Sequence, residues 1–259
     1  MKSNPNIMLT EKSYQSNNII ETQPIQILEI RFKVFLLKDI PQEESLIRIA
    51  GCIDRVLLKE EKWKEFHSTN QFKNYVFCAP YPLAEHGLYQ KHKIYQIIIR
   101  TVDFNLAQYL SIQLPQYEDD YLKGLICEHN IIPRRTITSL YTLTPLIIKS
   151  DRNKYWRDNM SFEDFEEQIK INLIKKYKAY TNQNVDETFS FHSFLELKNK
   201  VPIKIPYKRI HLLADKVQLQ ITDYPMAQEL AYFAQGVGLG TMGSRGYGFV
   251  NAIYQKGRR

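Results

Sequence analysis

The 259-residue sequence contains the same order of predicted elements twice, and this repetition constrains its fold more than any other feature. Alternating apolar residues predict strands, and apolar residues three and four positions apart predict helices. The first series is a strand (25–40), a helix (41–58), two strands (75–83 and 93–103), a helix (106–114) and strand-like sequence from 133 onward. The second series is a strand (144–149), a helix (161–180), two strands (189–198 and 209–222), a helix (225–235) and a strand (247–254).

Two of the predicted helices carry local start signals. Pro41 suits the first turn of a helix, where its missing N–H has no partner, and Glu43 and Glu44 complement the helix dipole. Ser161 followed three residues later by Asp164 is close to a capping box. Both helix starts therefore support the assignment of a helix after the first strand of each series.

A β-α-β-β-α-β series is typical of the ferredoxin-like module. We therefore predict an α+β fold of two tandem ferredoxin-like (RRM-like) modules. The first module is predicted to span 25–143 and the second 144–259, after a polar N-terminal extension, 1–24.

Composition bounds the class of protein. Hydrophobic residues make up 44% and charged residues 24%, which is typical of folded proteins in water. The sequence has no run of 18 apolar residues and no apolar run near its start, so we predict neither a membrane span nor a signal peptide. Three cysteines without CxxC spacing, Cys52, Cys78 and Cys127, favour a reducing compartment, and we expect a cytoplasmic protein.

The charge is positive and unevenly distributed. The formal net charge is +7, no acidic residue follows Glu229, and the stretch 197–214 contains five cations and no anion. Basic stretches of this kind are typical of surfaces that bind a phosphate backbone. A net charge of +7 alone is equally compatible with a role in solubility.

Six of the ten glycines lie in GVGLGTMGSRGYGFV, residues 236–250. Gly238 to Gly243 formally match GxGxxG, but a dinucleotide site requires that motif to follow a strand and open a helix, and here it follows a helix and precedes a strand. RGYGFVNA, residues 245–252, matches seven of eight positions of the RNA-recognition signature. That signature is followed by a helix and another strand, for which the remaining sequence is too short.

The same glycine-rich stretch, between the last helix and the last strand of a second ferredoxin-like module, resembles the C-terminal signature of the repeat-associated RNA-binding proteins of CRISPR systems, in particular the sixth Cas family. HLLADKVQLQ and TPLIIK agree with this resemblance more weakly. Members of that family are endoribonucleases that cut CRISPR repeat RNA into guide RNAs. The resemblance implies the same activity here.

The resemblance also implies a mechanism without metal or other cofactor. In that family the 2′-hydroxyl attacks the adjacent phosphate and leaves a 2′,3′-cyclic phosphate and a 5′-hydroxyl. Such a reaction needs a base, an acid and a cation. Many members carry a histidine after the first helix with a lysine shortly behind it, and these positions correspond to His67 and Lys73. Some members use a tyrosine on the first helix, but residues 41–58 contain none.

Alternatives remain at each candidate catalytic residue. His67 is equally compatible with a histidine in a polar surface loop. His86 and His92 are rivals in the same module, and Tyr75 lies near in sequence. A metal centre is disfavoured, because the acidic run 118–120 is typical of a solvated loop and no Cys/His spacing fits zinc.

Candidate RNA-binding residues lie in three groups. In the glycine-rich stretch, positive-φ glycines bring backbone amides close to a ligand and an arginine adds a bidentate phosphate donor. The alternative is a structural loop that packs the modules together. The first group comprises Gly236, Gly238, Gly240, Gly243, Arg245 and Gly246, the second Arg134 and Arg135, and the third Lys198, Lys200, Lys204, Lys208 and Arg209.

The third group flanks VPIKIP, for which we predict a protruding hairpin, and lysines with prolines there also protect a sheet edge. The lysines at 175, 176 and 178 are read more simply as a helix C-terminus.

The predicted function is thus metal-independent cleavage of CRISPR repeat RNA, with the repeat, as a hairpin or unpaired strand, as partner. A non-catalytic RNA-binding or scaffold subunit of a CRISPR effector complex is the alternative, which the missing helix tyrosine favours. Contacts with effector subunits and a homodimer are left open.

Overall fold

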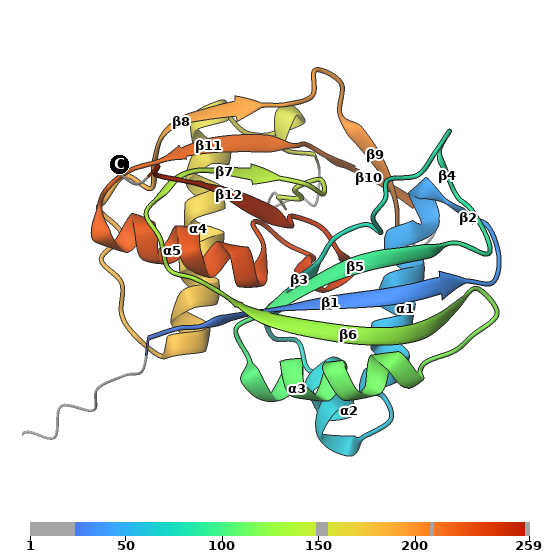
Figure 1. Cartoon of the computed structure of the whole chain (residues 1–259). Helices are drawn as coiled ribbons and strands as arrows, with labels where there is room; N and C mark the ends of the chain where they lie inside the picture. Colours follow the sequence, from blue (N-terminus) through green and yellow to red (C-terminus); the bar gives the residue numbers. More distant parts are fainter. Residues whose placement is uncertain (1–23, 149–154, 208–209, 257–259) are drawn as a thin grey trace, which may run out of the picture.

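The computed structural model describes residues 24–148, 155–207 and 210–256, and they form two four-stranded antiparallel sheets, each covered by helices (Figure 1). The first module comprises β1 (Ile27–Leu36), α1 (Ser45–Leu57), α2 (Glu61–Ser68), β3 (Tyr75–Phe77), β5 (Ile94–Thr101), α3 (Phe104–Gln113) and β6 (Leu122–Ile132). Its sheet has the order β3-β5-β1-β6. The second and third strands in sequence thus lie on one side of the first strand and the fourth on the other, as in a ferredoxin-like module.

The second module comprises β7 (Ile137–Thr142), α4 (Phe162–Thr181), β8 (His192–Leu197), β11 (Val217–Ile221), α5 (Pro225–Val237) and β12 (Val250–Tyr254). Its sheet has the order β12-β7-β11-β8, which is the same topology. A two-stranded hairpin, β9 (Ile203–Tyr207) and β10 (Ile210–Ala214), is inserted between β8 and β11. The predicted α+β fold of two tandem ferredoxin-like modules is confirmed.

The first strand and the helix starts follow from their sequences. Along β1, inward residues such as Ile30, Phe32 and Val34 alternate with polar residues, and they fill the core of the first module. A 3-10 turn (Gln42–Glu44) follows Pro41 before α1 begins. The predicted capping box is present, since the Ser161 hydroxyl accepts the Asp164 amide at 3.0 Å and the Asp164 carboxylate accepts the Ser161 amide at 3.3 Å.

The boundary between the modules differs from the prediction of 143/144. Strand β7 pairs with β11 and β12, so the second module begins at 137. The strand that closes the first sheet is β6, which pairs with β1 along its whole length. The described part of TPLIIK, residues 144–148, is not a strand, since Leu146 and Ile147 form only isolated bridges. The sequence is misleading here because 122–148 is strand-like almost throughout, and only pairing assigns β6 and β7 to different sheets.

Two further elements differ from those predicted from the sequence. The polar stretch after α1 contains the helix α2, anchored by the buried Trp63. The strand predicted over 209–222 is divided into β10 and β11, with Asp215 at the break. β10 pairs with β9 and β11 with β7 and β8, so one continuous apolar stretch serves two sheets.

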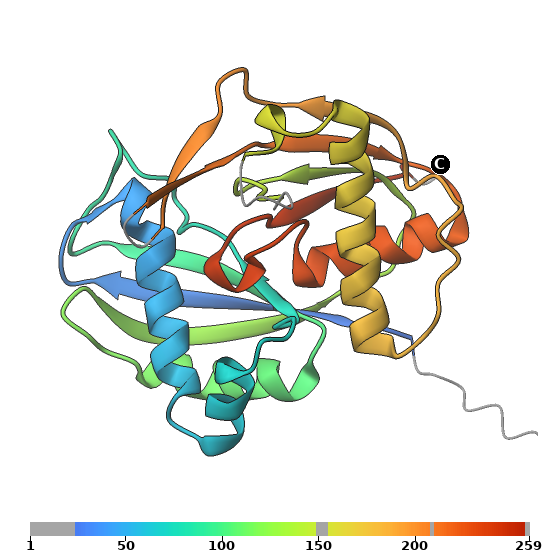
Figure 2. The same ribbon diagram turned by 180° about the vertical axis from the view of Figure 1, so that it is seen from behind.

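The two sheets are joined by buried contacts. Arg100 of β5 pairs with Glu29 at 2.8 Å and donates to the Val250 carbonyl at 2.7 Å and to Asn251 Oδ1 at 2.9 Å, both in β12. Phe249 packs beside Val76 of β3. The segment that follows α5 therefore lies against the first module, and Figure 2 shows this red loop between α1 and α4.

Candidate active site

His67 lies in the last turn of α2. This helix is held against the first module by Trp63, whose ring meets Phe66 edge-on at 5.8 Å and Tyr109 of α3 at 5.3 Å. Because residues four apart share a helix face, His67 extends from the same face as the buried Trp63. The imidazole retains 25% exposure, so His67 is a partly enclosed helix residue rather than the loop histidine of the alternative reading.

Asp54 of α1 brings His67 together with the glycine-rich loop of the other module. One carboxylate oxygen, Oδ1, lies 3.4 Å from His67 Nδ1, a charge contact longer than a good hydrogen bond. The other, Oδ2, accepts a hydrogen bond from Arg245 Nη1. Burial alone would lower the pKa of Arg245, but the hydrogen bond and charge of Asp54 raise it, so this guanidinium stays charged. Asp54 is not among the residues predicted from the sequence, where its being the one acidic residue of α1 was the available signal.

Lys73 lies next to this group. Its ammonium donates to the Thr69 carbonyl at 2.7 Å and to the Phe66 carbonyl, so it caps the C-terminal end of the helix that carries His67. Burial lowers the pKa of Lys73, the charge of Arg245 lowers it further, and Asp54 opposes both. Arg245 and Lys73 thus lie near Asp54, the carboxylate that contacts the imidazole, and two cations so close together can attract an anionic phosphate.

The glycines of the loop are mostly buried between the modules. A Cβ on Gly236 would lie 2.9 Å from Val102, and one on Gly246 would lie 2.6 Å from Phe77. A Cβ on Gly240 would lie 2.5 Å from the Ile147 carbonyl oxygen, and Gly238, with φ +72°, would meet the Gly248 carbonyl at 2.9 Å. Because these glycines have no side chain, the loop can pack between the modules, as the structural alternative predicts. The packing of these four buried glycines does not support direct contact with RNA.

Only the tip of the loop, 241–245, is partly exposed. It contains Met242 in the left-handed conformation and a 3-10 turn (Gly243–Arg245). Gly243 and Arg245 are the two candidate RNA-binding residues of this group that reach solvent. The tip and the segment 71–75 enclose a cavity of about 130 Å³ that is also lined by Lys73 and Lys176.

Lys176 is a second residue that the sequence reading missed. The sequence predicts that it belongs with its neighbours to a helix C-terminus, but its side chain is buried and points from α4 to the end of α5. Its ammonium donates to the carbonyls of Val237 at 3.3 Å and Gly238 at 2.8 Å, where the glycine-rich loop begins. Burial lowers its pKa to about 7. An exposed and a buried lysine look the same in sequence, and only the packing of α4 against α5 separates them.

The predicted hairpin exists and lies beside the loop. Lys198, Lys200 and Lys204 are exposed at its base and along β9, whereas Lys208 and Arg209 lie outside the described residues. Ile205 of β9 clusters with Tyr247 of the glycine-rich loop and with Leu46 of α1. A cavity of about 710 Å³, with Lys204 and Lys216 among its lining residues, lies between the hairpin and the start of α1.

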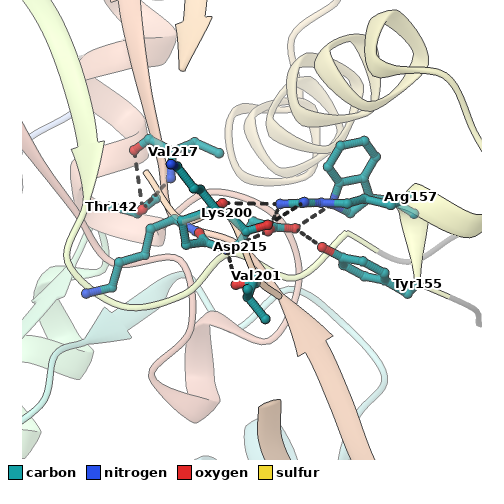
Figure 3. A network of polar contacts seen from close by, with 10 residues as sticks. Thr142, Tyr155, Arg157, Lys200, Val201, Asp215 and Val217 are labelled. Carbon is teal, nitrogen blue, oxygen red and sulfur yellow. Dashed lines mark hydrogen bonds and ion pairs between the residues drawn. The ribbon is translucent and has the colours of Figure 1, made fainter. Parts of the chain in front are cut away.

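A buried carboxylate fixes the base of this hairpin (Figure 3). Asp215 accepts hydrogen bonds from Tyr155 at 2.6 Å, Trp156 at 2.7 Å and Asn199 at 2.8 Å, and it pairs with Arg157 at 2.5 Å. Arg157 also donates to the Lys200 carbonyl at 3.1 Å. Three of the donors precede α4 in sequence and Asn199 follows it. The network therefore ties the base of the hairpin to the segment before that helix.

Arg134 and Arg135 lie in the connection between β6 and β7. Arg134 pairs with Glu229 of α5, donates to the Ile25 carbonyl at 2.8 Å and stacks on Tyr232. Arg135 stacks on Tyr254, and no acidic partner is found for it among the described residues. Arg134 therefore links the modules, and Arg135 is the better placed of the two for a phosphate.

The other candidates do not join the site. Tyr75 is buried in β3, and burial raises its pKa, so it does not replace the missing helix tyrosine. His86 and His92 occupy positive-φ positions in the loops around the short strand β4 (Leu88–Tyr89). Within the described ranges, no group of histidine, cysteine and acidic side chains could hold a metal ion, and no helix is long and apolar enough to cross a membrane.

Residues 127–252 match the family model described as CRISPR associated protein Cas6, C-terminal. Nearly half of the chain is thus similar to the C-terminal part of Cas6 proteins. The match extends from within β6 to within β12, and so it includes the glycine-rich loop and the hairpin. The resemblance inferred from residues 236–250 is confirmed.

Solved structures extend the likeness over both modules. A CRISPR associated protein Cas6 is 18% identical, with 88% of this chain and 99% of that chain covered and a TM-score of 0.63. A RAMP protein binding different RNA substrates is 16% identical, with 87% and 99% covered and a TM-score of 0.62.

A Thermus thermophilus Cas6 in a product complex is 15% identical, with 88% and 100% covered and a TM-score of 0.62. At these identities the likeness shows the Cas6 fold. A search of curated proteins finds no significant match.

Proposed function

We propose that this Cas6-like protein cleaves CRISPR repeat RNA at the junction of its two modules. The observation that carries the proposal is the meeting of His67, from the first module, with Arg245, from the glycine-rich loop of the second, on the carboxylate of Asp54. A proton-transfer group and a fixed cation side by side are what cleavage by an internal hydroxyl requires. The match of residues 127–252 to the Cas6 C-terminal model and the likeness to a Cas6 product complex support RNA as the substrate.

In the proposed reaction the 2′-oxygen forms a bond to phosphorus while the bond from phosphorus to the 5′-oxygen breaks. His67 accepts the proton of the 2′-hydroxyl. The leaving 5′-oxygen takes up a proton from the imidazolium or from solvent, and the products are a 2′,3′-cyclic phosphate and a 5′-hydroxyl. Arg245 and Lys73 stabilise the negative charge on the phosphate oxygens, and no metal ion is needed for these steps.

Binding of the RNA is assigned to the exposed cations around the site. Gly243 and Arg245 at the loop tip face the cleavage position, and Lys198, Lys200 and Lys204 extend the positive surface along the hairpin. Arg135 adds a cation on the connection between the modules. Phosphate contacts of this kind make affinity fall steeply with salt concentration.

The test is cleavage of the cognate repeat RNA in EDTA. Wild type is expected to yield a product that ends in a cyclic phosphate, detected by its resistance to polyadenylation until the phosphate is removed. His67→Ala should lower the single-turnover rate at least about 100-fold. The matched control is His129→Ala, an exposed histidine on β6, which should cut at the wild-type rate. Normal cleavage by the His67 variant rejects the assignment, and a requirement for magnesium rejects the mechanism.

A second candidate is a non-catalytic RNA-binding subunit of a CRISPR effector complex. It is favoured by α1, which contains no tyrosine, and by Lys73, whose ammonium donates to the carbonyls of Phe66 and Thr69 at the end of α2. Tight, salt-sensitive binding of the repeat without cleavage under any condition would select it. Association with effector subunits belongs to this candidate, and a homodimer would be detected by light scattering.

We also propose a cytoplasmic location. The three cysteines are free, and two of them, Cys52 and Cys78, are buried thiols. Free thiols are typical of proteins in a reducing compartment.

A further inference from the structure

We propose that Asp54 is a positioning residue, which sets the tautomer of His67 and thereby makes its outer ring nitrogen the base. This inference rests on the proposed function, since it assigns a role within the same site. It is carried by the position of Asp54 between His67 and Arg245 and by the hydrogen-bonding capacities of the three side chains.

The two oxygens of Asp54 face different partners. Oδ2 accepts from Arg245 Nη1, and Asp54 is the sole side-chain acceptor found for Arg245 in the described part of the chain. Oδ1 is buried and has no hydrogen-bond partner among the described residues, and His67 Nδ1 lies 3.4 Å from it. A buried carboxylate oxygen without a donor is unfavourable, because it has lost its contacts with water and gained none in return. The ring nitrogen that faces it is therefore expected to carry a proton.

The direction of this contact determines which nitrogen is available for catalysis. A neutral imidazole has one N–H and one lone pair. If Nδ1 carries the proton and donates it toward Asp54, then Nε2 carries the lone pair and can accept the proton of the 2′-hydroxyl. The carboxylate also stabilises the imidazolium that forms once the proton is taken up.

Arg245 makes this arrangement specific. A guanidinium can only donate, so the Asp54 oxygen that faces it must accept. In Asp54→Asn the amide oxygen would therefore turn to Arg245, and the NH₂ group would face His67. Nδ1 would then have to accept, the ring proton would move to Nε2, and the base would lose its lone pair. The substitution changes one atom but reverses the polarity of the contact.

A purely structural role predicts something different. Asp54 also links α1 to the loop tip through Arg245, so a mere clamp would alter thermal stability and RNA affinity without altering the tautomer. The readout must therefore report on the ring nitrogens. The ¹⁵N chemical shifts of His67, measured at a pH at which the ring is neutral, distinguish the two tautomers.

The experiment compares wild type, Asp54→Asn and the control Asp119→Asn. Asp119 pairs with Arg55, the neighbour of Asp54 in α1, at 2.8 Å, so its variant breaks a similar aspartate–arginine pair close to the same helix. The measurements are the His67 ¹⁵N shifts, the single-turnover rate, and the Kd for a repeat RNA that carries a 2′-deoxy sugar at the cleavage position.

We expect the Nδ1–H tautomer in wild type and in Asp119→Asn, and the Nε2–H tautomer in Asp54→Asn. The rate of Asp54→Asn should fall at least about tenfold, because the base has the wrong tautomer, while the Kd changes less than about threefold. An Nε2–H tautomer in wild type overturns the inference without any variant. A folded Asp54→Asn variant that cleaves at the wild-type rate also overturns it. If wild type does not cleave at all, the proposed function fails, whereas the tautomer measurement still decides the role of Asp54.

Discussion

The first helices of the two modules occupy equivalent places in the ferredoxin-like topology, yet their polar residues point to opposite uses. Helix α1 presents Asp54 at the module junction, where it meets His67 and Arg245. Helix α4 buries Lys176, which holds the carbonyls at the start of the glycine-rich loop. The first module thus supplies the candidate base, and the second supports the segment that delivers a cation to it. The difference teaches that packing two copies of one module brings together residues that neither copy holds alone.

The glycine-rich loop combines the same two roles, structural support and contact with the candidate site, within fifteen residues. Its buried glycines allow close packing, and its tip carries the side chain that reaches the candidate site. The following predictions test this division, starting with the largest expected effect.

Packing of the loop depends on Gly248, which has φ +72° and whose added Cβ would lie 1.9 Å from the Leu239 carbonyl oxygen. Gly248→Ala should lower the free energy of unfolding by about 3 kcal/mol, from the strained backbone and the steric clash together. Chemical denaturation measures this value. Gly51→Ala is the control, because a Cβ at that helical glycine meets nothing within 4 Å. It should raise stability by up to about 1 kcal/mol, and a similar loss in both variants would contradict the packing role.

The contribution of the second module to the reaction depends on Arg245. Arg245→Ala should lower the single-turnover rate about 100-fold, since the loss of one fixed donor to the transition state has an effect of that size. The control is Arg55→Ala, which removes an exposed arginine that follows Asp54 in α1 and pairs with Asp119. This variant should cleave at the wild-type rate. Equal rates for the Arg245 variant and wild type would confine the chemistry to the first module.

The support from α4 predicts a pH dependence of stability. The pKa of Lys176 is lowered by burial from the ordinary lysine value of 10.5 to about 7. Below about pH 7 the ammonium is charged in both the folded and the unfolded chain, so the cost of burying the charge is fully present. Between pH 7 and 10.5 only the unfolded chain retains the proton, so the free energy of unfolding rises with pH.

Lys176→Met should therefore remove a rise in stability that wild type shows between pH 7 and pH 9. Denaturant titrations across this interval measure it. Lys175→Met, at the exposed neighbouring position, should keep the rise. An unchanged pH slope in the Lys176 variant would mean that this ammonium keeps its charge in the core.

Much of the fold could be predicted from the sequence because its signals are local. The capping residues Ser161 and Asp164, the periodicity of α5 and the alternation along β1 determine the element types and their order. The candidate histidine and lysine were likewise accessible from the sequence, through resemblance to the Cas6 family, and their catalytic roles stay predictions. The boundary near 137 could not be predicted, because strand-like sequence does not state which sheet it will join.

The sequence by itself determined that two like modules follow one another and that a glycine-rich loop precedes the last strand of the second. Only the tertiary structure decided what the loop does, with glycines packed between the modules and Arg245 directed to Asp54. It also decided that Lys176 is buried while Lys175 is exposed. The physical reason is that element type follows from neighbours in the chain. Burial and ion pairing, in contrast, depend on residues such as Asp54 and Arg245, which are far apart in sequence and meet only when the two modules pack.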